Sequence, residues 1–270
     1  MKLPITYLFV PGNRPERFDK ALASGADAVI LDLEDAVAPR DKGTARASVQ
    51  QWIAANRAAA ERTLVRINDS ATPWFAADIN MLRAAGIPSA MLPKAETQAQ
   101  IQAVAAALQA GGSVLAIIET ALGLKNVDAV AAARGVQRLA FGTLDFGVDL
   151  KLSGDDRGLI YPSAQIALAS RCAGIGSPVA GVTPTIDDET RLLADLAFAR
   201  AFGFGAKLCI HPKQVAAIRK ALIPTAAEVD WARRVIAAVE GSEGAAQVDG
   251  KMVDRPVFLK AQSIIALATP

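Results

Sequence analysis

Ser113-Val-Leu-Ala-Ile-Ile-Glu119 and Leu139-Ala-Phe-Gly-Thr-Leu-Asp145 are the two segments that decide the expected fold. Each contains a short apolar run bounded by turn residues, which is typical of a buried parallel strand. Each run is followed by a carboxylate, Glu119 or Asp145. The carboxyl ends of parallel strands form the mouth of a barrel or of an open α/β sheet, where active sites are built. Two carboxylates from neighbouring strands could hold one Mg²⁺ there, although helix capping would account for either acid alone.

Strand-like and helix-like runs alternate through most of the chain. The expected strands are residues 7–10, 28–33, 63–67, 90–93, 114–119, 138–141, 178–182 and 206–211. The helix-like runs include residues 15–24, 44–57, 73–85, 97–110, 158–173, 187–202 and 213–221. Eight strands with a helix after each indicate a (β/α)₈ TIM barrel, and a doubly wound open sheet is the alternative.

The last part of the chain has a different pattern. A helix is expected over residues 226–239, followed by a joint rich in Gly and Ser at residues 241–244 and a last helix that ends near residue 268. We therefore divide the chain into a barrel domain, residues 1–223, and a C-terminal helical extension, residues 224–270. An extension joined through glycines could form a lid or an oligomer contact, and a helix that only covers the outside of the barrel is the alternative.

Composition excludes several classes of function. The net charge is +2 with both signs interspersed, and only 5% of the residues are aromatic, so neither nucleic acid nor a membrane surface is an expected partner. Cys172 and Cys209 have no Cys or His at ligand spacing, and we expect buried free thiols in a reducing compartment. No signal peptide begins the chain and no apolar run is long enough to span a bilayer, which predicts a cytoplasmic protein.

Charged residues follow the second and third expected strands. Asp32, Glu34 and Asp35 come within four residues at the end of a buried strand, where acids are costly unless they meet cations, water or backbone donors. Asp32 and Asp35 are expected to surround a metal site without necessarily binding the ion, although a helix cap and a surface ion pair would explain Asp35. Arg66 on the next strand would need an anionic partner inside a barrel, so it is expected to pair with these acids or with a substrate oxygen.

Two further strand ends carry residues that could take part in a reaction, Lys94 and His211. Lys94 follows the fourth strand and could pair with the acids, bind a phosphate or form a Schiff base, which would require burial to lower its pKa. With so many acids nearby we expect Lys94 to keep its charge, which disfavours a Schiff-base aldolase. Like Asp32 and Asp35, Lys94 is expected to surround the metal site without binding the ion. His211 is the only histidine and precedes Pro212, which is more typical of a fixed structural group than of a base. Nucleophilic hydrolysis and nucleotide chemistry are disfavoured because no Ser-His-Asp set, Gly-x-Gly-x-x-Gly motif or phosphate loop is found.

Motifs at almost every strand end resemble the citrate lyase β-subunit-like family of acyl-CoA lyases. The family belongs to the HpcH/HpaI aldolase superfamily and includes relatives of malyl-CoA and citramalyl-CoA lyases. The motifs are residues 9–15 (FVPGNRP), 31–36 (LDLEDA), 65–68 (VRIN), 92–95 (LPKA), 118–121 (IETA), 141–145 (FGTLD) and 209–214 (CIHPKQ).

The resemblance implies a TIM barrel with a Mg²⁺ ion, or Mn²⁺ in its place, held by Glu119 and Asp145. Arg66 matches the arginine that contacts substrate beside the metal. Asp254, in residues 250–256 (GKMVDRP), resembles the catalytic aspartate of a C-terminal lid, which in the family closes over the active site of a neighbouring subunit in a trimer or hexamer.

The same resemblance implies roles for His211 and Arg14 in binding coenzyme A, and it implies a class of substrate. His211 is expected in the wall beside the thioester, and Arg14 near the nucleotide of coenzyme A. The implied reaction is reversible cleavage of a 3-hydroxy-3-carboxylic acyl-CoA, of the citramalyl-CoA or malyl-CoA type, into acetyl-CoA and a 2-oxo acid. Thioester hydrolysis is a conceivable side activity. The alternatives are a citrate lyase β subunit that acts on a carrier-protein thioester, a 2-oxo acid aldolase without coenzyme A, and a non-catalytic binding barrel.

The sequence departs from the family pattern at two positions. Ser163 stands where the family often has an arginine, and Ala180 stands where its seventh strand usually carries an acid. Both departures are expected to alter which acyl group fits, and neither touches the expected metal ligands.

Overall fold

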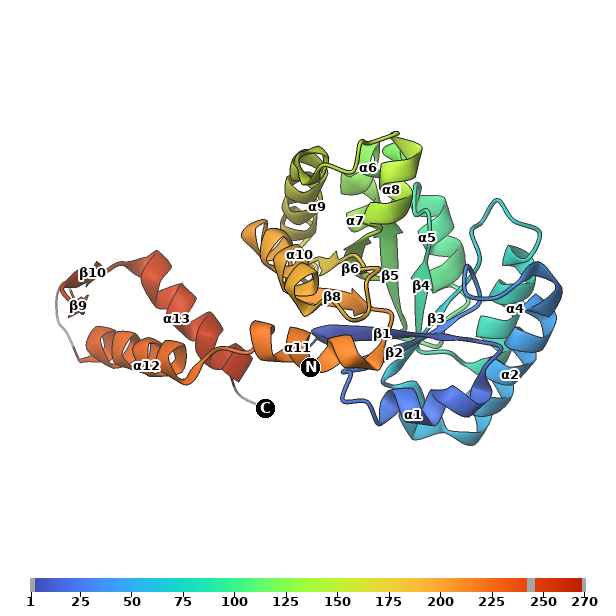
Figure 1. Cartoon of the computed structure of the whole chain (residues 1–270), viewed down its shortest axis with the longest axis horizontal. Helices are drawn as coiled ribbons and strands as arrows, with labels where there is room; N and C mark the ends of the chain where they lie inside the picture. Colours follow the sequence, from blue (N-terminus) through green and yellow to red (C-terminus); the bar gives the residue numbers. More distant parts are fainter. Residues whose placement is uncertain (1–2, 242–245, 269–270) are drawn as a thin grey trace. The chain divides into compact units, whose positions relative to one another are not determined.

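A computed structural model describes residues 3–241 and 246–268. Its central feature is a closed barrel of eight parallel strands in sequential order (Figure 1). The strands are β1 (Thr6–Pro11), β2 (Ala28–Asp32), β3 (Thr63–Arg66), β4 (Ser89–Leu92), β5 (Ser113–Ile118), β6 (Val136–Phe141), β7 (Val179–Ala180) and β8 (Ala206–Cys209). Because β8 pairs with β1, for example Lys207 with Thr6, the sheet has no open edge. The predicted (β/α)₈ barrel is confirmed and the open-sheet alternative is wrong.

The barrel interior is a packed hydrophobic core. Successive strand residues alternate between the interior and the surrounding helices, as the period of two requires. The inward-facing cluster consists of Tyr7, Ala28, Ile30, Leu64, Met91, Leu115, Ile117, Ala140, Val179, Ala206 and Leu208. This filling leaves the carboxyl ends of the strands as the place where polar side chains can converge.

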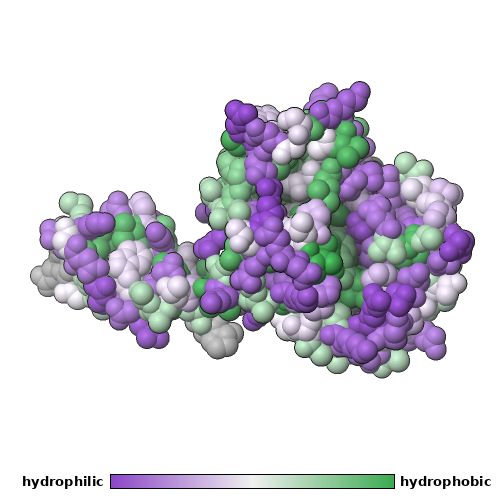
Figure 2. All heavy atoms as spheres, in the orientation of Figure 1, coloured by the Kyte–Doolittle hydropathy of each residue, from purple (hydrophilic) through white to green (hydrophobic). Residues whose placement is uncertain are grey.

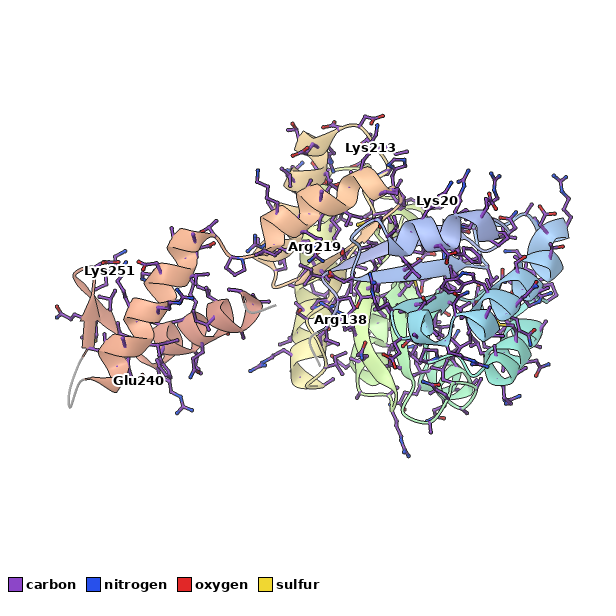
Figure 3. The ribbon with its side chains drawn as sticks, turned by 90° about the horizontal axis from the view of Figure 1, so that it is seen from below. Lys20, Arg138, Lys213, Arg219, Glu240 and Lys251 are labelled. Carbon is purple, nitrogen blue, oxygen red and sulfur yellow. The ribbon has the colours of Figure 1, made fainter. Side chains whose placement is uncertain are left out.

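Arg138 closes the amino-terminal end of the interior. Its guanidinium donates to the carbonyl oxygens of Pro4 and Ser177 and lies 5.9 Å from the ring centre of Tyr7 (Figure 3). Only 2% of this residue is exposed. The buried charge is therefore satisfied by backbone oxygens at the end of the barrel opposite the expected site.

Helices follow the strands around the barrel. The longer ones are α2 (Lys42–Ala55), α4 (Phe75–Ala85), α5 (Gln98–Ala105), α9 (Ile160–Cys172), α10 (Glu189–Ala201) and α11 (Pro212–Leu222). The shorter ones are α1 (Phe18–Leu22), α3 (Arg57–Ala60), α6 (Ala121–Lys125), α7 (Val127–Ala131) and α8 (Thr143–Asp149), together with the 3₁₀ turns η1 (Pro15–Arg17), η2 (Pro39–Asp41) and η3 (Asp156–Leu159). The sequence did not predict α6, α7 or α8, because helices of five to seven residues are too short to show a helical period.

The structure divides into two compact units, Met1–Ile218 and Arg219–Pro270. The division lies inside α11, whereas the sequence placed the boundary just after this helix. In the second unit, α12 (Ala226–Glu240) and α13 (Arg255–Ala268) surround a small core centred on Ala232, Val235 and Ala261. Most of the joint expected at residues 241–244 lies outside the described residues.

A hairpin in the second unit was not expected from the sequence. The strands β9 (Ala246–Val248) and β10 (Lys251–Val253) pair in antiparallel fashion. Asp249 and Gly250 form the turn between them with positive φ angles of 51° and 72°. Such a two-residue turn favours Gly and Asp, which adopt this conformation readily.

The two cysteines have different environments. Cys209 is buried, and burial raises the pKa of its thiol to about 12. Cys172 is exposed, so the prediction that both thiols are buried is wrong for this residue. It lies in the last turn of α9, on the side of the helix away from the barrel core. Within the described residues, no helix has the length and hydrophobicity to cross a membrane.

Candidate active site

Five charged residues reach the mouth of the barrel from consecutive strands. Asp32 and Arg66 are the last residues of β2 and β3. Lys94 lies two residues after the end of β4, Glu119 comes directly after β5, and Asp145 lies in the first turn of α8 after β6. Since all strands are parallel, their carboxyl ends meet on the same face of the barrel. The structure therefore brings together the acids, the arginine and the lysine that the sequence predicted for this site.

Arg66 is held by carboxylates from the segment that follows β2. Its Nε and Nη2 donate to Oδ1 and Oδ2 of Asp32 at 2.7 and 2.6 Å, and its Nη1 lies 2.8 Å from Oε2 of Glu34. The guanidinium also lies over the ring of Phe9, 4.7 Å from the centroid. Burial alone would lower the pKa of Arg66, but the neighbouring carboxylates outweigh it and raise the pKa. The result is a fixed, permanently charged donor at the barrel mouth.

Both carboxylate oxygens of Asp32 are already occupied by hydrogen bonds, so neither is available to bind a metal. Besides its two bonds from Arg66, Oδ1 accepts from the backbone N–H of Glu34 and Oδ2 from that of Ala36. The side chain is 1% exposed. Asp32 therefore orients Arg66 and shapes the turn after β2. Asp35 is 69% exposed and reaches Arg66 at 3.3 Å, so it does not form the helix cap considered from the sequence.

Glu119 is a buried carboxylate whose charge is only partly compensated. Its Oε1 accepts a hydrogen bond from the backbone N–H of Lys94 at 2.8 Å. Burial, together with repulsion from Glu34 and Asp145, raises the pKa of Glu119 to about 8. Gly142 makes room for this carboxylate, because a methyl group at that position would lie 2.3 Å from Oε2. The site thus holds an acid that needs a cation to remain ionised at neutral pH.

Lys94 adopts an unusual backbone conformation for a residue with a side chain. Its φ angle is +44°, in the left-handed region that costs about 1–3 kcal/mol outside glycine and clusters at functional sites. Its Nζ lies 3.6 Å from Oε1 of Glu34. Burial alone would lower the pKa of Lys94, but Glu34, Glu119 and Asp145 outweigh it and raise the pKa. An amine that stays protonated is a poor Schiff-base nucleophile, in agreement with the expectation from the sequence.

The donor set suits a hard divalent cation that is completed by other ligands. Among the described residues, no three His, Cys, Asp or Glu side chains converge closely enough to hold a metal ion alone. Glu119 offers Oε2, and the exposed Asp145 accepts no hydrogen bond within the described part of the chain. Mg²⁺ is typically bound by one or two carboxylates, with water and substrate oxygens in the other positions. These two residues therefore fit such an ion.

Three further predicted site residues have no contact with this cluster of charges within the described part of the chain. Arg14 is exposed before η1, and its Nε donates to Glu16 at 2.7 Å. His211 follows β8 at the same end of the barrel, where its Nδ1 accepts from the backbone N–H of Lys213 at 3.2 Å. Asp254 is exposed in the second unit and caps α13, since its Oδ1 accepts from the backbone N–H of Val257 at 3.1 Å.

The sequence did not predict the central position of Glu34 in the site. Glu34 bridges Arg66 and Lys94, and burial together with the neighbouring acids raises its pKa to about 7 despite the two cations. Because side chains alternate along a strand, residues 32 and 34 share one face, and this alternation is the signal in the sequence that points to Glu34. Phe9 and Gly142 were not singled out, because their roles depend on contacts between different strands.

Comparisons with known proteins point to one family of aldolases and lyases. The family model described as HpcH/HpaI aldolase/citrate lyase matches residues 6–212. Citrate lyase subunit beta of Leuconostoc mesenteroides subsp. cremoris is 34% identical over 99% of this chain and 94% of its own length. The (3S)-malyl-CoA thioesterase of Cereibacter sphaeroides (strain ATCC 17029) is 33% identical over 97% and 93%. The crystal structure of CitE from Mycobacterium tuberculosis with magnesium, acetoacetate and coenzyme A superposes with a TM-score of 0.84 at 36% identity, covering 97% of both chains.

Proposed function

Because the chain belongs to the HpcH/HpaI aldolase/citrate lyase family, we propose that it is a Mg²⁺-dependent carbon–carbon lyase for a coenzyme A thioester. The substrate would be a 3-hydroxy-3-carboxylic acyl-CoA, with citramalyl-CoA as the leading example, and the products acetyl-CoA and a 2-oxo acid. The observation that carries this proposal is that the fixed Arg66 guanidinium lies at the same barrel mouth as the incompletely compensated acid Glu119 and the exposed Asp145.

Glu119 and Asp145 would hold the metal. A bound Mg²⁺ supplies a Lewis acid that polarises the oxygens of a 2-oxo acid and fixes their orientation. The similar M. tuberculosis protein has been crystallised with magnesium together with pyruvate or with acetoacetate and coenzyme A. Lys94 partly offsets the negative charge of Glu34 and Glu119, and Asp32 keeps the arginine in place.

Arg66 would stabilise the negative charge that develops on oxygen when the carbon–carbon bond breaks. Its Nε and Nη2 are committed to Asp32, which leaves Nη1 on the side of Glu34 and Asp35. A preorganised donor of this kind costs no reorganisation during the reaction, and loss of one typically reduces turnover by about 10²–10³.

Asp254 would transfer the proton to or from the acetyl carbon. A carboxylate positioned at the reacting carbon acts as a general acid or base. We propose that Asp254 reaches the active site of a neighbouring subunit in a trimer or hexamer, and that His211 and Arg14 contact the thioester and nucleotide ends of coenzyme A.

The function is tested by product analysis with citramalyl-CoA and malyl-CoA at saturating Mg²⁺. We expect acetyl-CoA and an equal amount of pyruvate or glyoxylate, loss of turnover with EDTA, and a decrease of at least about 10²-fold in Arg66→Lys. Arg40→Lys, whose side chain is 88% exposed, is the matched control and should retain activity. Acyl-CoA binding without turnover of either substrate would contradict the proposal.

Thioester hydrolysis is the second candidate, because one relative is named a (3S)-malyl-CoA thioesterase. The same assay separates the two activities. Hydrolysis releases free coenzyme A and an intact hydroxy acid, whereas carbon–carbon cleavage releases a 2-oxo acid and leaves the thioester intact.

A further inference from the structure

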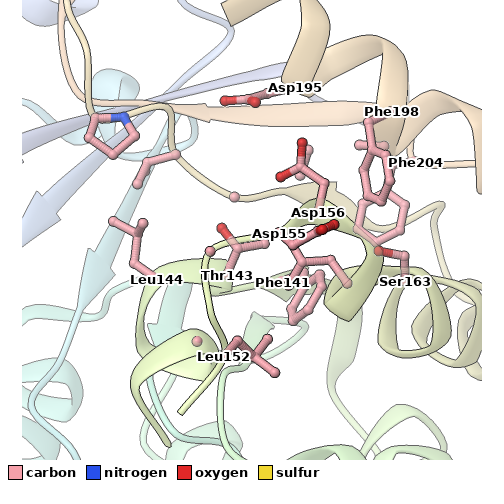
Figure 4. A pocket seen from close by; sticks show the side chains of 18 of the residues that line it. Phe141, Thr143, Leu144, Leu152, Asp155, Asp156, Ser163, Asp195, Phe198 and Phe204 are labelled. Carbon is pink, nitrogen blue, oxygen red and sulfur yellow. The ribbon is translucent and has the colours of Figure 1, made fainter. Parts of the chain in front are cut away.

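A cavity of about 600 Å³ lies on the outer side of the barrel wall, between the sheet and its helices. It is bounded by the ends of β6 and β7, by α8 and the segment after it, and by α10. Figure 4 shows Phe198, Phe204 and Ser163 at one end of this cavity and Leu144 at the other. Neither Glu119 nor Asp145 is among its lining residues. We call it the lateral cavity, and it is separate from the site at the barrel mouth.

Most of the wall of the lateral cavity is apolar. The apolar lining residues are Phe141, Leu144, Val148, Leu152, Leu159, Ala180, Val182, Pro184, Phe198, Ala199 and Phe204. Some of this apolar surface is open, since Leu144 is 51% and Val148 79% exposed, and Figure 2 shows apolar patches within the hydrophilic surface of the barrel unit. A cavity of this size and character suits a small molecule with a substantial apolar part.

Both positions at which the sequence departs from the family pattern line the lateral cavity. Ser163 on α9 is 3% exposed and Ala180 on β7 is 4% exposed. Both side chains are small and line the wall of the cavity, so larger side chains at these two positions would reduce its volume.

Lys207 is a buried cation in the wall of the lateral cavity. It is 1% exposed, and its Nζ donates one hydrogen bond to the carbonyl oxygen of Gly181 at 2.7 Å. An ammonium group has three donors, and within residues 3–241 and 246–268 the other two find neither a hydrogen bond nor an ion pair. Burial lowers the pKa of Lys207 to about 8, against a smaller opposite effect of Asp195. A buried ammonium with a single neutral acceptor calls for an anion.

The acids around the lateral cavity already have partners. Asp195 binds Arg191 at 2.7 Å and accepts from the hydroxyl of Thr183 at 2.6 Å. Asp156 pairs with Arg191 at 3.3 Å, and Asp155 pairs with Arg157 at 2.6 Å. Asp156 and Asp195 share the single guanidinium of Arg191. Two cations that line the cavity, the exposed Lys151 and the buried Lys207, contact no carboxylate within the described part of the chain. Lys207 is therefore the buried cation that can receive the anionic group of a ligand.

We propose that the lateral cavity binds a monocarboxylate with an aliphatic chain, with the carboxylate on Lys207 and the chain along the apolar wall toward Phe198 and Phe204. A chain of roughly six to ten carbons matches a pocket of this size. The ligand is the unesterified carboxylate, and its binding needs neither Mg²⁺ nor coenzyme A, so binding can be measured separately from the proposed lyase reaction.

The probe for this site is sodium octanoate, measured by titration calorimetry on the full-length protein in EDTA at pH 7. We expect saturable binding that is at least about tenfold tighter than that of octan-1-ol, because the alcohol has the chain but not the charge-assisted hydrogen bond. Lys207→Met should weaken octanoate binding by about the same factor. Lys125→Met, at an exposed lysine of α6, is the matched control and should bind as the unchanged protein does.

Two further variants fill the cavity without touching its charge. Ala180→Leu and Ser163→Leu, from β7 and α9, should each abolish octanoate binding while circular dichroism shows an unchanged fold. These variants keep the test decisive if Lys207→Met does not fold. Equal binding of octanoate and octan-1-ol, absence of octanoate binding, or undiminished binding in both filled variants would overturn the assignment.

Discussion

Gly142, the residue after β6, matters because it leaves no room for a side chain beside Glu119, a proposed metal ligand. In Gly142→Ala the new methyl group would lie 2.3 Å from Oε2 and 2.6 Å from Cβ of Glu119, so the carboxylate must move. Displacing a ligand or its support typically costs 10–100-fold in metal affinity. We expect the Mg²⁺ concentration for half-maximal activity to rise by about tenfold or more.

Gly147→Ala is the control for this substitution, because nothing lies within 4 Å of the added methyl group. It lies in the same short helix as Asp145. Its activation by Mg²⁺ should equal that of the unchanged protein. Equal Mg²⁺ dependence of both variants would remove Glu119 from the metal site.

Lys207 makes stability depend on pH in the alkaline range. Burial lowers its pKa from 10.5 to about 8 in the folded protein, so above pH 8 the unfolded chain binds more protons than the folded one. Stability therefore rises with pH through this contribution, by up to about 3 kcal/mol once both pKa values are passed. The buried thiol of Cys209 has the opposite effect above its ordinary pKa of 9.0, because burial raises its pKa to about 12.

The Lys207 contribution is consequently best measured between pH 8 and 9. The free energy of unfolding is measured by urea denaturation at each pH. Lys207→Met should exceed the wild type most at pH 7, and the difference should shrink progressively toward pH 9. The same pH dependence in the wild type and in Lys207→Met would show that this amine is not the titrating group.

At the scale of single elements, Asp254 has two separable roles. Its side chain caps α13 in this structure, and we propose that it also transfers a proton. Asn is as good an N-cap as Asp, whereas Ala lacks the acceptor and costs about 1 kcal/mol. Asp254→Asn should therefore keep the thermal stability and Mg²⁺ binding of the protein and lose cleavage.

Asp254→Ala provides the comparison, since it should lose both cleavage and part of the stability of α13. Thermal unfolding and product formation are measured on the same samples. Full turnover in Asp254→Asn would confine this residue to capping the helix.

The elements differ in how well the sequence predicts them. The strands of the barrel were found within a few residues because each is a short apolar run that ends in a turn. Strand seven was expected over residues 178–182, but only Val179–Ala180 is regular, and Gly181 beyond it lies against the backbone oxygen of Phe141. The hairpin of β9 and β10 was missed although Asp249-Gly250 is a strong turn signal.

At the scale of the whole molecule, the proposed active site combines a barrel with the extension of another subunit. Glu119→Gln and Asp254→Asn should each be inactive alone for different reasons. Mixed and allowed to exchange subunits, they should recover activity in up to roughly a quarter of the sites, since an intact barrel then meets an intact Asp254.

Recovery is measured as acetyl-CoA formation after mild dissociation and reassociation of the two proteins. Two samples of Glu119→Gln mixed with each other serve as the control and should stay inactive. No recovery after proven subunit exchange would place Asp254 and Glu119 of one chain in the same site.

The features that the sequence did not predict depend on how separate elements pack in the whole molecule. Glu119, Asp145 and Arg66 were recognisable because each stands in a short motif at a strand end. The bridging position of Glu34 and the lateral cavity arise where separate strands and helices pack together, which no local pattern records. In the sequence, Ser163 and Ala180 stood out only because they differ from the family pattern. In the structure, the packing of α9 against the sheet brings both into the wall of the lateral cavity.

Helix α8 has a different neighbour on each side. It carries Asp145, and it also contributes Thr143, Leu144, Gly147 and Val148 to the wall of the lateral cavity. A fatty acid bound in the cavity would contact the helix that carries the proposed metal ligand, without touching any reacting atom. The concentration of free fatty acids in the cell would then regulate the activity of the enzyme through the position of this helix.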